Sequence, residues 1–461
     1  MKTERTQSEH RFKGPGRREI VARFDGGTIS SDGGAVLLAE VERKTRIVER
    51  FAGCFRDHRD PARVEHTARE LALQRILGLC LGYEDLIDHE TLRVDPLLSS
   101  LSGKPDPRSA LAGKSTFSRL ELSTADGASA DRYKRLSLDT DAVDRHFVEV
   151  FLESHSQAPD RIVIDLDATD FAIHGLQEGR FFHGYYDQYC YLPLYIFCGE
   201  HLLRARLRRS NIDASAGTIG EIAPIVEQIC MRWPKTQILI RADSGFCREE
   251  IMAWCEQQGV DYVLGIARND RLLAMISYEL GMAAMDFAAT GKASRSFCEL
   301  EYATLHTWSR SRRVVAKAEY LAGKENPRFV VTSLPAREIE ARELYEEIYC
   351  ARGDMENRIK EQQLDLFADR ISAATMQANQ VRLYFASIAY TLMQALRRLG
   401  LAGTELERAQ CGTIRLRLLK IGAQVRISVR RVWLALSQAF PLQELFGRVL
   451  ANVRARAAPA N

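Results

Sequence analysis

The stretch DRIVIDLDATDF (160–171) decides the fold class, because it has the pattern of an apolar strand that ends in carboxylates. Ile and Val fill its first half, as in strands that are buried on both faces of a sheet. Residues two apart share one face of a strand, so we expect Asp165 and Asp167 on the same side. Ligands of open α/β sheets collect at the carboxyl ends of the strands, so these acids mark a candidate site.

Further strands and helices follow this stretch in the order of an α/β domain. They are two apolar strands, YCYLPLYIFCG (189–199) and HLLRARLRRSN (201–211), an amphipathic helix, GTIGEIAPIVEQICMRW (217–233), a fourth strand, TQILIRADSGF (236–246), a helix, CREEIMAWCEQQG (247–259), and a fifth strand, VDYVLGIA (260–267). The pattern predicts that the first, fourth and fifth strands are parallel. This order resembles that of a ribonuclease-H-like core.

The fourth strand also ends in an acid, Asp243, which is followed by Ser-Gly. If the first and fourth strands are neighbours, Asp167 and Asp243 meet at one end of the sheet. Two facing carboxylates repel each other, and a divalent cation, which takes hard oxygen ligands, removes that repulsion. Two alternatives stay open. Either Asp alone can form a turn or cap a helix, and Asp165 competes with Asp167 for the first position.

A third carboxylate is expected from the helical stretch YCARGDMENRIKEQQ (349–363). At about 100° per residue, one stripe of this helix carries Tyr349, Arg352, Glu356, Lys360 and Gln363. A core-facing stripe would be aliphatic, and a purely solvated stripe needs no tyrosine. Glu356 is therefore the candidate that completes a magnesium site, whereas Asp354 points elsewhere. The alternative is a surface helix in which Arg352 and Glu356 form an ordinary ion pair.

Composition narrows the class of protein. The chain has 461 residues, 46% of them hydrophobic, and a formal net charge of +3, as in soluble proteins of several domains. From residue 397 onward, twelve Lys and Arg stand against three Glu. This end is either a phosphate-binding or subunit-contact surface or a solvated basic face. Ten cysteines without a CxxC pair favour reduced thiols in a cytoplasmic protein. We expect neither a signal peptide nor a membrane span.

The polar stripe carries a resemblance to the DDE transposases of bacterial insertion sequences. The similar group is marked by Y-x2-R-x3-E-x6-K on the helix that bears the catalytic glutamate. Tyr349, Arg352 and Glu356 match its first three positions. Gln363 stands where that group has lysine, and Lys360 lies one turn earlier on the same face. This departure leaves open whether Lys360 replaces the lysine.

The two aspartates extend the resemblance. Asp167, in its Asp-Ala-Thr setting, matches the first aspartate of the family, and Asp243 matches the second. The resemblance implies that Asp167, Asp243 and Glu356 are catalytic and hold two Mg²⁺ ions, for which Mn²⁺ can substitute. It also implies cut-and-paste excision through a hairpin on the transposon end. The implied partners are terminal inverted repeats, target DNA and a second subunit in a synaptic homodimer, at the nucleoid of a bacterial cytoplasm.

Seven side chains are expected to contact DNA: Tyr349, Arg352, Lys360, Trp308, Arg310, Arg312 and Arg119. Trp308, Arg310 and Arg312 are predicted to alternate onto one strand face, where the indole offers a stacking platform for a flipped base. The alternative is a core tryptophan of a small β domain. Arg119 lies in LAGKSTFSRLEL (111–122), a predicted helix for which a scaffold role is equally open.

The expected fold is α/β, a ribonuclease-H-like catalytic core with added domains. The division is 1–158, a mostly helical domain that binds DNA ends; 159–267, the first part of the core; 268–336, a β-rich insertion; 337–400, core helices with the catalytic Glu; and 401–461, a basic mixed or helical region for DNA contact or dimerisation. Two alternatives to a transposase are a metal-dependent nuclease of the same fold and a DNA-binding protein without catalysis. The added domains argue against the first, and the intact acids argue against the second.

Overall fold

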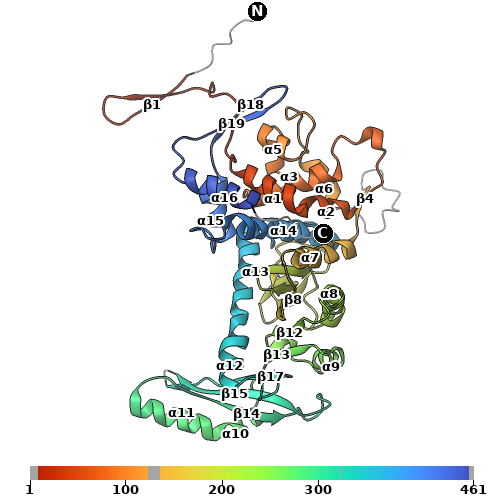
Figure 1. Cartoon of the computed structure of the whole chain (residues 1–461), viewed down its shortest axis with the longest axis vertical. Helices are drawn as coiled ribbons and strands as arrows, with labels where there is room; N and C mark the ends of the chain where they lie inside the picture. Colours follow the sequence, from red (N-terminus) through yellow and green to blue (C-terminus); the bar gives the residue numbers. More distant parts are fainter. Residues whose placement is uncertain (1–8, 123–134, 322, 456–461) are drawn as a thin grey trace, which may run out of the picture. The chain divides into compact units, whose positions relative to one another are not determined.

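The computed structural model describes residues 9–122, 135–321 and 323–455, which form two compact units (Figure 1). Of the described residues, the first unit comprises 9–53, 59–120 and 395–455, and the second comprises 54–58, 121–122, 135–321 and 323–394. The domain boundaries near residues 158 and 401 stay a prediction. Helix α7 (Thr140–Glu153) packs on the sheet of the second unit, and the C-terminal segment packs with the N-terminal helices.

The second unit is built on a large mixed sheet (Figure 1). In sheet order its described strands are β11 (His201–Arg206), β10 (Leu194–Cys198), β6 (Arg161–Ala168), β12 (Gln237–Ala242), β13 (Asp261–Ile266), β17 (Arg328–Thr332), β15 (Arg312–Leu321) and β14 (Ser294–Tyr302), and the short β16 (Lys324–Glu325) pairs with β15. The first, fourth and fifth predicted strands are β6, β12 and β13, and they are parallel neighbours, as predicted. The predicted second strand is broken at Pro193 into β9 (Gln188–Tyr191) and β10, which runs antiparallel to β6.

The predicted β-rich insertion does not form a separate sheet. Strand β17 pairs antiparallel with β13, and β15 and β14 continue outward from it. These strands cover the edge of β13, whose backbone groups would otherwise lack sheet partners. Two helices, α10 (Asp270–Met275) and α11 (Ser277–Thr290), precede the strands, and α11 packs on β14 and β15 (Figure 1).

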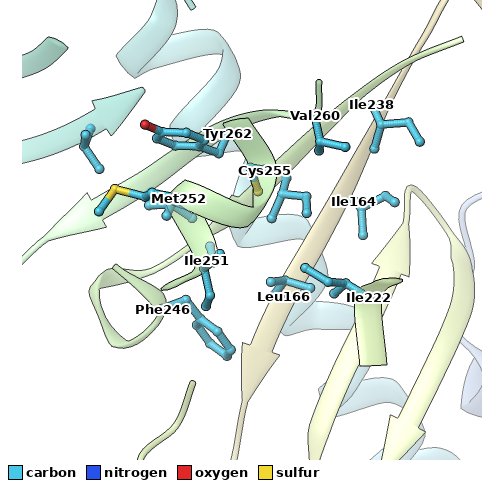
Figure 2. Close-up of a cluster of buried hydrophobic side chains, with 14 of the residues drawn as sticks. Ile164, Leu166, Ile222, Ile238, Phe246, Ile251, Met252, Cys255, Val260 and Tyr262 are labelled. Atoms are coloured by element: carbon cyan, nitrogen blue, oxygen red, sulfur yellow. The ribbon is translucent and has the colours of Figure 1, made fainter. Parts of the chain in front are cut away.

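The two faces of this sheet are covered by different elements. Ile164 and Leu166 of β6 point into a cluster with α8 (Thr218–Arg232) and α9 (Glu249–Gln258), which Figure 2 shows. The opposite face packs against Leu344 and Tyr345. Because side chains alternate along a strand, the odd-numbered residues of β6 and β12 face this second layer. The acids at the ends of both strands therefore face the helix that carries the tyrosine-arginine stripe.

That helix is interrupted rather than regular. It consists of α12 (Ala341–Glu343), a π-helical segment η3 (Leu344–Tyr349), a 3₁₀ turn η4 (Cys350–Arg352) and α13 (Gly353–Leu366). Short π-helical segments within α-helices occur often at functional sites. The remaining elements of this unit are η2 (Ser244–Phe246), α14 (Met376–Leu396), which ends in the first unit, and the short strands β4 (Phe55–Asp57), β5 (Leu136–Leu138), β7 (Phe171–Ala172) and β8 (Phe181–His183).

The first unit is mostly helical, as the sequence predicts for the N-terminal part. Its helices are α1 (Ala35–Thr45), α2 (Ile47–Gly53), η1 (Pro61–Arg63), α3 (Ala68–Cys80), α4 (Asp88–Leu92), α5 (Pro96–Leu101), α6 (Lys114–Glu121), η5 (Arg397–Leu401), α15 (Cys411–Ile414), η6 (Arg415–Leu419) and α16 (Gln443–Ala455). Its strands are β1 (His10–Lys13), β2 (Glu19–Ala22), β3 (Ile29–Ser30), β18 (Ala423–Ile427) and β19 (Val432–Leu436). Within the described ranges, no helix is both long enough and apolar enough to cross a membrane.

Candidate active site

Asp167 and Asp243 occupy corresponding positions on neighbouring parallel strands. In the pairing of β6 with β12, Leu166 stands opposite Ala242, and each acid is the next residue. Adjacent strands lie about 4.8 Å apart, so the two aspartates stand side by side at the same edge of the sheet. The predicted meeting of the two aspartates at the carboxyl ends of their strands follows from this register.

Glu356 of the interrupted helix is near enough to Asp167 to affect its pKa. Burial raises the pKa of Asp167 to about 7; Arg352 acts against this shift, and the like charges of Asp243 and Glu356 add to it. Arg352 in turn interacts with all three acids, and these outweigh its burial, so its pKa is raised. One guanidinium therefore compensates a cluster of three carboxylates from three separate elements.

Glu356 is held by this same arginine. The Arg352 Nη2 donates to Glu356 Oε1 at 3.2 Å, so the i,i+4 pair expected for a surface helix does form. The pair is not a surface feature alone, because Arg352 is largely buried and also faces Asp167 and Asp243. The Arg352–Glu356 ion pair and the interaction of Arg352 with Asp167 and Asp243 therefore belong to the same group of charged side chains.

Asp165, the alternative to Asp167, has a different partner. Its two carboxylate oxygens accept from Arg241 Nε at 2.6 Å and Nη2 at 2.8 Å, and both residues are buried. Burial raises the pKa of Asp165, and the hydrogen bond from Arg241 opposes that shift. The Arg241 guanidinium also donates to the carbonyl of Ile348. Asp165 therefore fixes an arginine that ties β12 to η3.

Tyr349 reaches the sheet edge because Gly265 leaves it room. A Cβ on Gly265 would lie 2.5 Å from the Tyr349 hydroxyl and 3.0 Å from the backbone nitrogen of Ser244. Burial raises the pKa of Tyr349, and among the charges near it are Arg352 and Asp243. The tyrosine hydroxyl is thus held beside the acids by the absence of a side chain on β13.

The carboxylates have the donor chemistry of a hard-cation site, but they are not closed around one point. Asp243 accepts from the backbone N–H of Gly245 at 2.8 Å and caps η2, as the turn-forming alternative predicts. Among the described residues, no group of three His, Cys, Asp or Glu side chains is placed to hold a metal ion. Arg352 supplies the positive charge between the acids in this arrangement.

Comparison with known proteins shows the family to which the chain belongs. The sequence model described as "Transposase DDE domain group 1" matches residues 12–458. The chain belongs to this transposase family. No curated protein matches it. A solved structure described as "Cryo-EM structure of piggyBac transposase synaptic complex with hairpin DNA (SNHP)" is similar at 10% identity with a TM-score of 0.42, covering 84% of this chain and 79% of that chain.

The insertion residues expected to contact DNA are placed differently in the transposase. Trp308 and Arg310 lie in the connection before β15, so they do not alternate with Arg312 on a strand. Arg312 is only 4% exposed and is held by Glu249 and Glu256, which leaves no free face for a phosphate. Arg310 is exposed and pairs with Glu256 at 2.9 Å. Trp308 is half-buried against Tyr302, which is nearer to the alternative of a core tryptophan than to an exposed stacking platform.

The remaining predicted contacts are on helices. Lys360 is exposed one turn after Glu356, and the described part of the chain gives it no ion pair with the acids. Arg119 is exposed on α6, which confirms the predicted helix but leaves both of its roles open.

Two residues that position groups of the candidate site were missed by sequence reasoning. Arg241 carries a visible signal, because a charged residue within the apolar strand LIRA (239–242) requires a buried partner. Asp165 at the matching position of β6 is that partner. Gly265 carries a weaker signal, a glycine inside a strand, which often marks a close approach of another group. Which group approaches cannot be read from the sequence.

Proposed function

We propose that this transposase cuts and rejoins phosphodiester bonds at the ends of a bacterial insertion sequence. The observation that carries the proposal is the convergence of Asp167, Asp243 and Glu356, from β6, β12 and α13, on Arg352. Membership of the DDE transposase family supports the same assignment of the three acids. The catalytic core would be ribonuclease-H-like. The strand order β11-β10-β6-β12-β13, in which β10 alone runs antiparallel to the other four strands, supports this.

The three carboxylates would hold the divalent ions of the reaction. Two Mg²⁺ ions, or Mn²⁺ in their place, would activate the attacking oxygen and stabilise the leaving one. The donors fit such ions in type, since hard cations prefer carboxylate oxygen. Closing the site requires Asp167 to lose its proton and Arg352 to release Glu356. Arg352 would then be free for a DNA phosphate, to which a guanidinium binds through paired hydrogen bonds.

The tyrosine and the arginine of the stripe would position the DNA. Tyr349 lies against Gly265 next to Asp243, so its hydroxyl can contact the phosphate or base at the cleaved bond. Its placement, together with Arg352 and Glu356, supports the cut-and-paste route through hairpin ends that the signature implies. Lys360, one turn further along α13, would contact the DNA backbone. Trp308 and Arg310 remain candidates at the far strands.

The protein would bind first the duplex of the terminal inverted repeats and then the target DNA. It would bind them as a homodimer, at the nucleoid in the bacterial cytoplasm. The basic C-terminal segment supplies one surface for it. Strands β18 and β19 form a hairpin whose Arg426, Arg430 and Arg431 are exposed, with Trp433 56% exposed beside them. A two-stranded ribbon of this kind fits the major groove of B-DNA. We assign end recognition to this hairpin, together with Arg119 on α6.

Cleavage of the native end DNA tests the proposal. Purified protein is incubated with Mg²⁺ and a labelled duplex that carries one border of its own gene. We expect nicks with 3′-OH ends at the border, and a loss of about three orders of magnitude in rate for Asp243→Asn with DNA binding retained. Cleavage without regard to the border sequence would instead indicate a plain nuclease. Binding without cleavage by the wild type would indicate a DNA-binding protein.

A further inference from the structure

A cavity of about 780 Å³ opens beside Asp243, one of the three acids. Its walls come from the carboxyl ends of β12 and β13, the start of β17, the short β16, and the side chains of Tyr349 and Arg352. Cavities of about 300–1,000 Å³ hold ligands of nucleotide size. Because Asp243 and Arg352 belong to both, the cavity is continuous with the proposed active site.

The cavity is lined by cations that lack an ion-pair partner among the described residues. Arg268, Lys324 and Arg328 are all exposed, and none of them forms a salt bridge there. Other cations of the same strands are paired: Arg312 with Glu249 and Glu256, Arg313 with Glu299, and Lys317 with Glu319. The acids that line the cavity are Asp243 and Glu325. Including Arg352, four cations therefore face two acids.

The strand order places these cations in a line with the acids. Proceeding along the sheet edge, Asp167 lies near the end of β6, Asp243 follows β12, Arg268 comes two residues after β13, and Arg328 opens the antiparallel β17. Leu264 pairs with Ala242 and Phe329 with Ile266, so Arg268 and Arg328 lie one and two strands away from Asp243 and further out beyond the carboxyl ends of β12 and β13. Arg328 is close enough to Tyr349 to affect its pKa, against the effect of burial. The cations therefore lie on the same edge of the sheet as Asp243 and share one cavity with it.

We infer that this cavity binds the DNA strand next to the bond that is cut, holding a nucleotide through its phosphate on Arg268, Arg328 and Lys324. The inference rests on the proposed function and adds a subsite to it. A strand whose phosphodiester lies at the acids continues along the sheet edge, and the next anionic groups meet the unpaired cations. The contact is to the backbone, so it fixes the register of the strand and carries no base sequence.

Binding measured without metal tests the subsite separately from catalysis. The variant is Arg268→Ala/Arg328→Ala in the full chain, and the ligand is the border duplex in EDTA at several salt concentrations. Each lost phosphate contact lowers the slope of log K against log salt by about 0.9, so we expect a decrease of about 1.8. The affinity falls at least tenfold at about 0.15 M salt, and with Mg²⁺ the cleavage rate falls as well. Both residues are exposed, and thermal unfolding checks that the variant folds.

The matched control is Arg232→Ala/Lys235→Ala. These two cations are also exposed, but they precede β12, at the opposite edge of the sheet. The control keeps the wild-type slope if the cavity is the subsite. An unchanged slope for Arg268→Ala/Arg328→Ala, or an equal change in both variants, overturns the inference while leaving the proposed function intact. In a further outcome, the wild type binds the duplex without cleaving it, while the salt slope of Arg268→Ala/Arg328→Ala is still lower than that of the wild type. That result overturns the proposed function only. Wild type that binds no DNA overturns both.

Discussion

At the scale of single residues, the unusual feature is an aspartate that is held close to its protonated form. Burial and the neighbouring acids raise the pKa of Asp167 to about 7, far above its ordinary value near 3.8. The folded chain therefore binds this proton more tightly than the unfolded chain does. The resulting stability is fully present below about pH 4 and is lost as the pH rises through 7.

Asp167→Asn removes this titration. In EDTA at pH 8 we expect the variant to exceed the wild type in free energy of unfolding by about 1–3 kcal/mol, and the difference to shrink as the pH is lowered toward 4. Urea unfolding across this range measures it. The control is Asp160→Asn, an exposed acid just before the same strand. A difference for Asp167→Asn that does not vary with pH would contradict the account.

Gly265 tests the placement of the tyrosine. In Gly265→Ala the new methyl group would lie 2.5 Å from the Tyr349 hydroxyl, so the tyrosine must move away from Asp243. Small misplacements of positioning groups cost about a hundredfold in rate, and we expect a decrease of that order in single-turnover cleavage. Gly220→Ala in α8, where a Cβ meets nothing within 4 Å, should cleave like the wild type. Equal rates for both variants would show that the hydroxyl is not required at this position.

At the scale of elements, a buried ion pair connects the sheet to the interrupted helix. Arg241 binds Asp165 through two hydrogen bonds and also donates to the carbonyl of Ile348 in η3. Removing one member of a buried pair leaves an uncompensated charge, whereas replacing both by apolar residues of similar size is often neutral. The contribution of this ion pair to stability can therefore be measured apart from its contribution to the position of η3.

We expect Asp165→Ala to lower the free energy of unfolding by about 3–5 kcal/mol. The double variant Asp165→Leu/Arg241→Met should recover most of that loss, yet it lacks the contact to Ile348, so cleavage should stay low. Denaturant unfolding and single-turnover cleavage give the two quantities. If the double variant cleaves at the wild-type rate, the ion pair has no part in positioning η3 and Tyr349.

Sequence patterns predicted the core elements well and the outer strands poorly. Strands β6, β12 and β13 are continuous apolar runs. Strands and helices in this order along the chain can form only a few sheet topologies. The partners of β14, β15 and β17 depend on which sheet edge is free, and alternation within each strand does not contain that information. Trp308 was misplaced for a local reason, because Thr304 accepts hydrogen bonds from the backbone N–H groups of Thr307 and Trp308 and ends the strand early.

At the scale of the whole molecule, groups of exposed positive charge are found in both compact units. In the second unit it lines the cavity beside Asp243, and in the first it is exposed on the β18–β19 hairpin. The sequence indicated the basic C-terminal segment but not that it folds with the N-terminal helices. That grouping depends on packing between segments more than 300 residues apart, such as α1 with α16.

The hairpin yields a prediction at this scale. Arg430→Ala/Arg431→Ala should weaken binding of the border duplex about tenfold or more and reduce its salt dependence, because each arginine that contacts a phosphate displaces a counterion. Cleavage at saturating DNA should change little. Arg43→Ala/Arg63→Ala removes the same charge from residues already paired with Glu40 and Asp60, and it serves as the control. Equal affinities for the two variants, measured by filter binding, would exclude the hairpin as a DNA contact.

The central claim, that three acids jointly bind the catalytic metal, is tested most directly by counting Mn²⁺ ions. Free Mn²⁺ is measured by electron paramagnetic resonance in titrations of the complex with border DNA, for wild type and for Asp167→Asn, Asp243→Asn and Glu356→Gln. We predict saturable binding of about two ions to the wild type, with affinity lowered at least tenfold in each variant. Wild-type Mn²⁺ binding in any of the three variants would contradict the account.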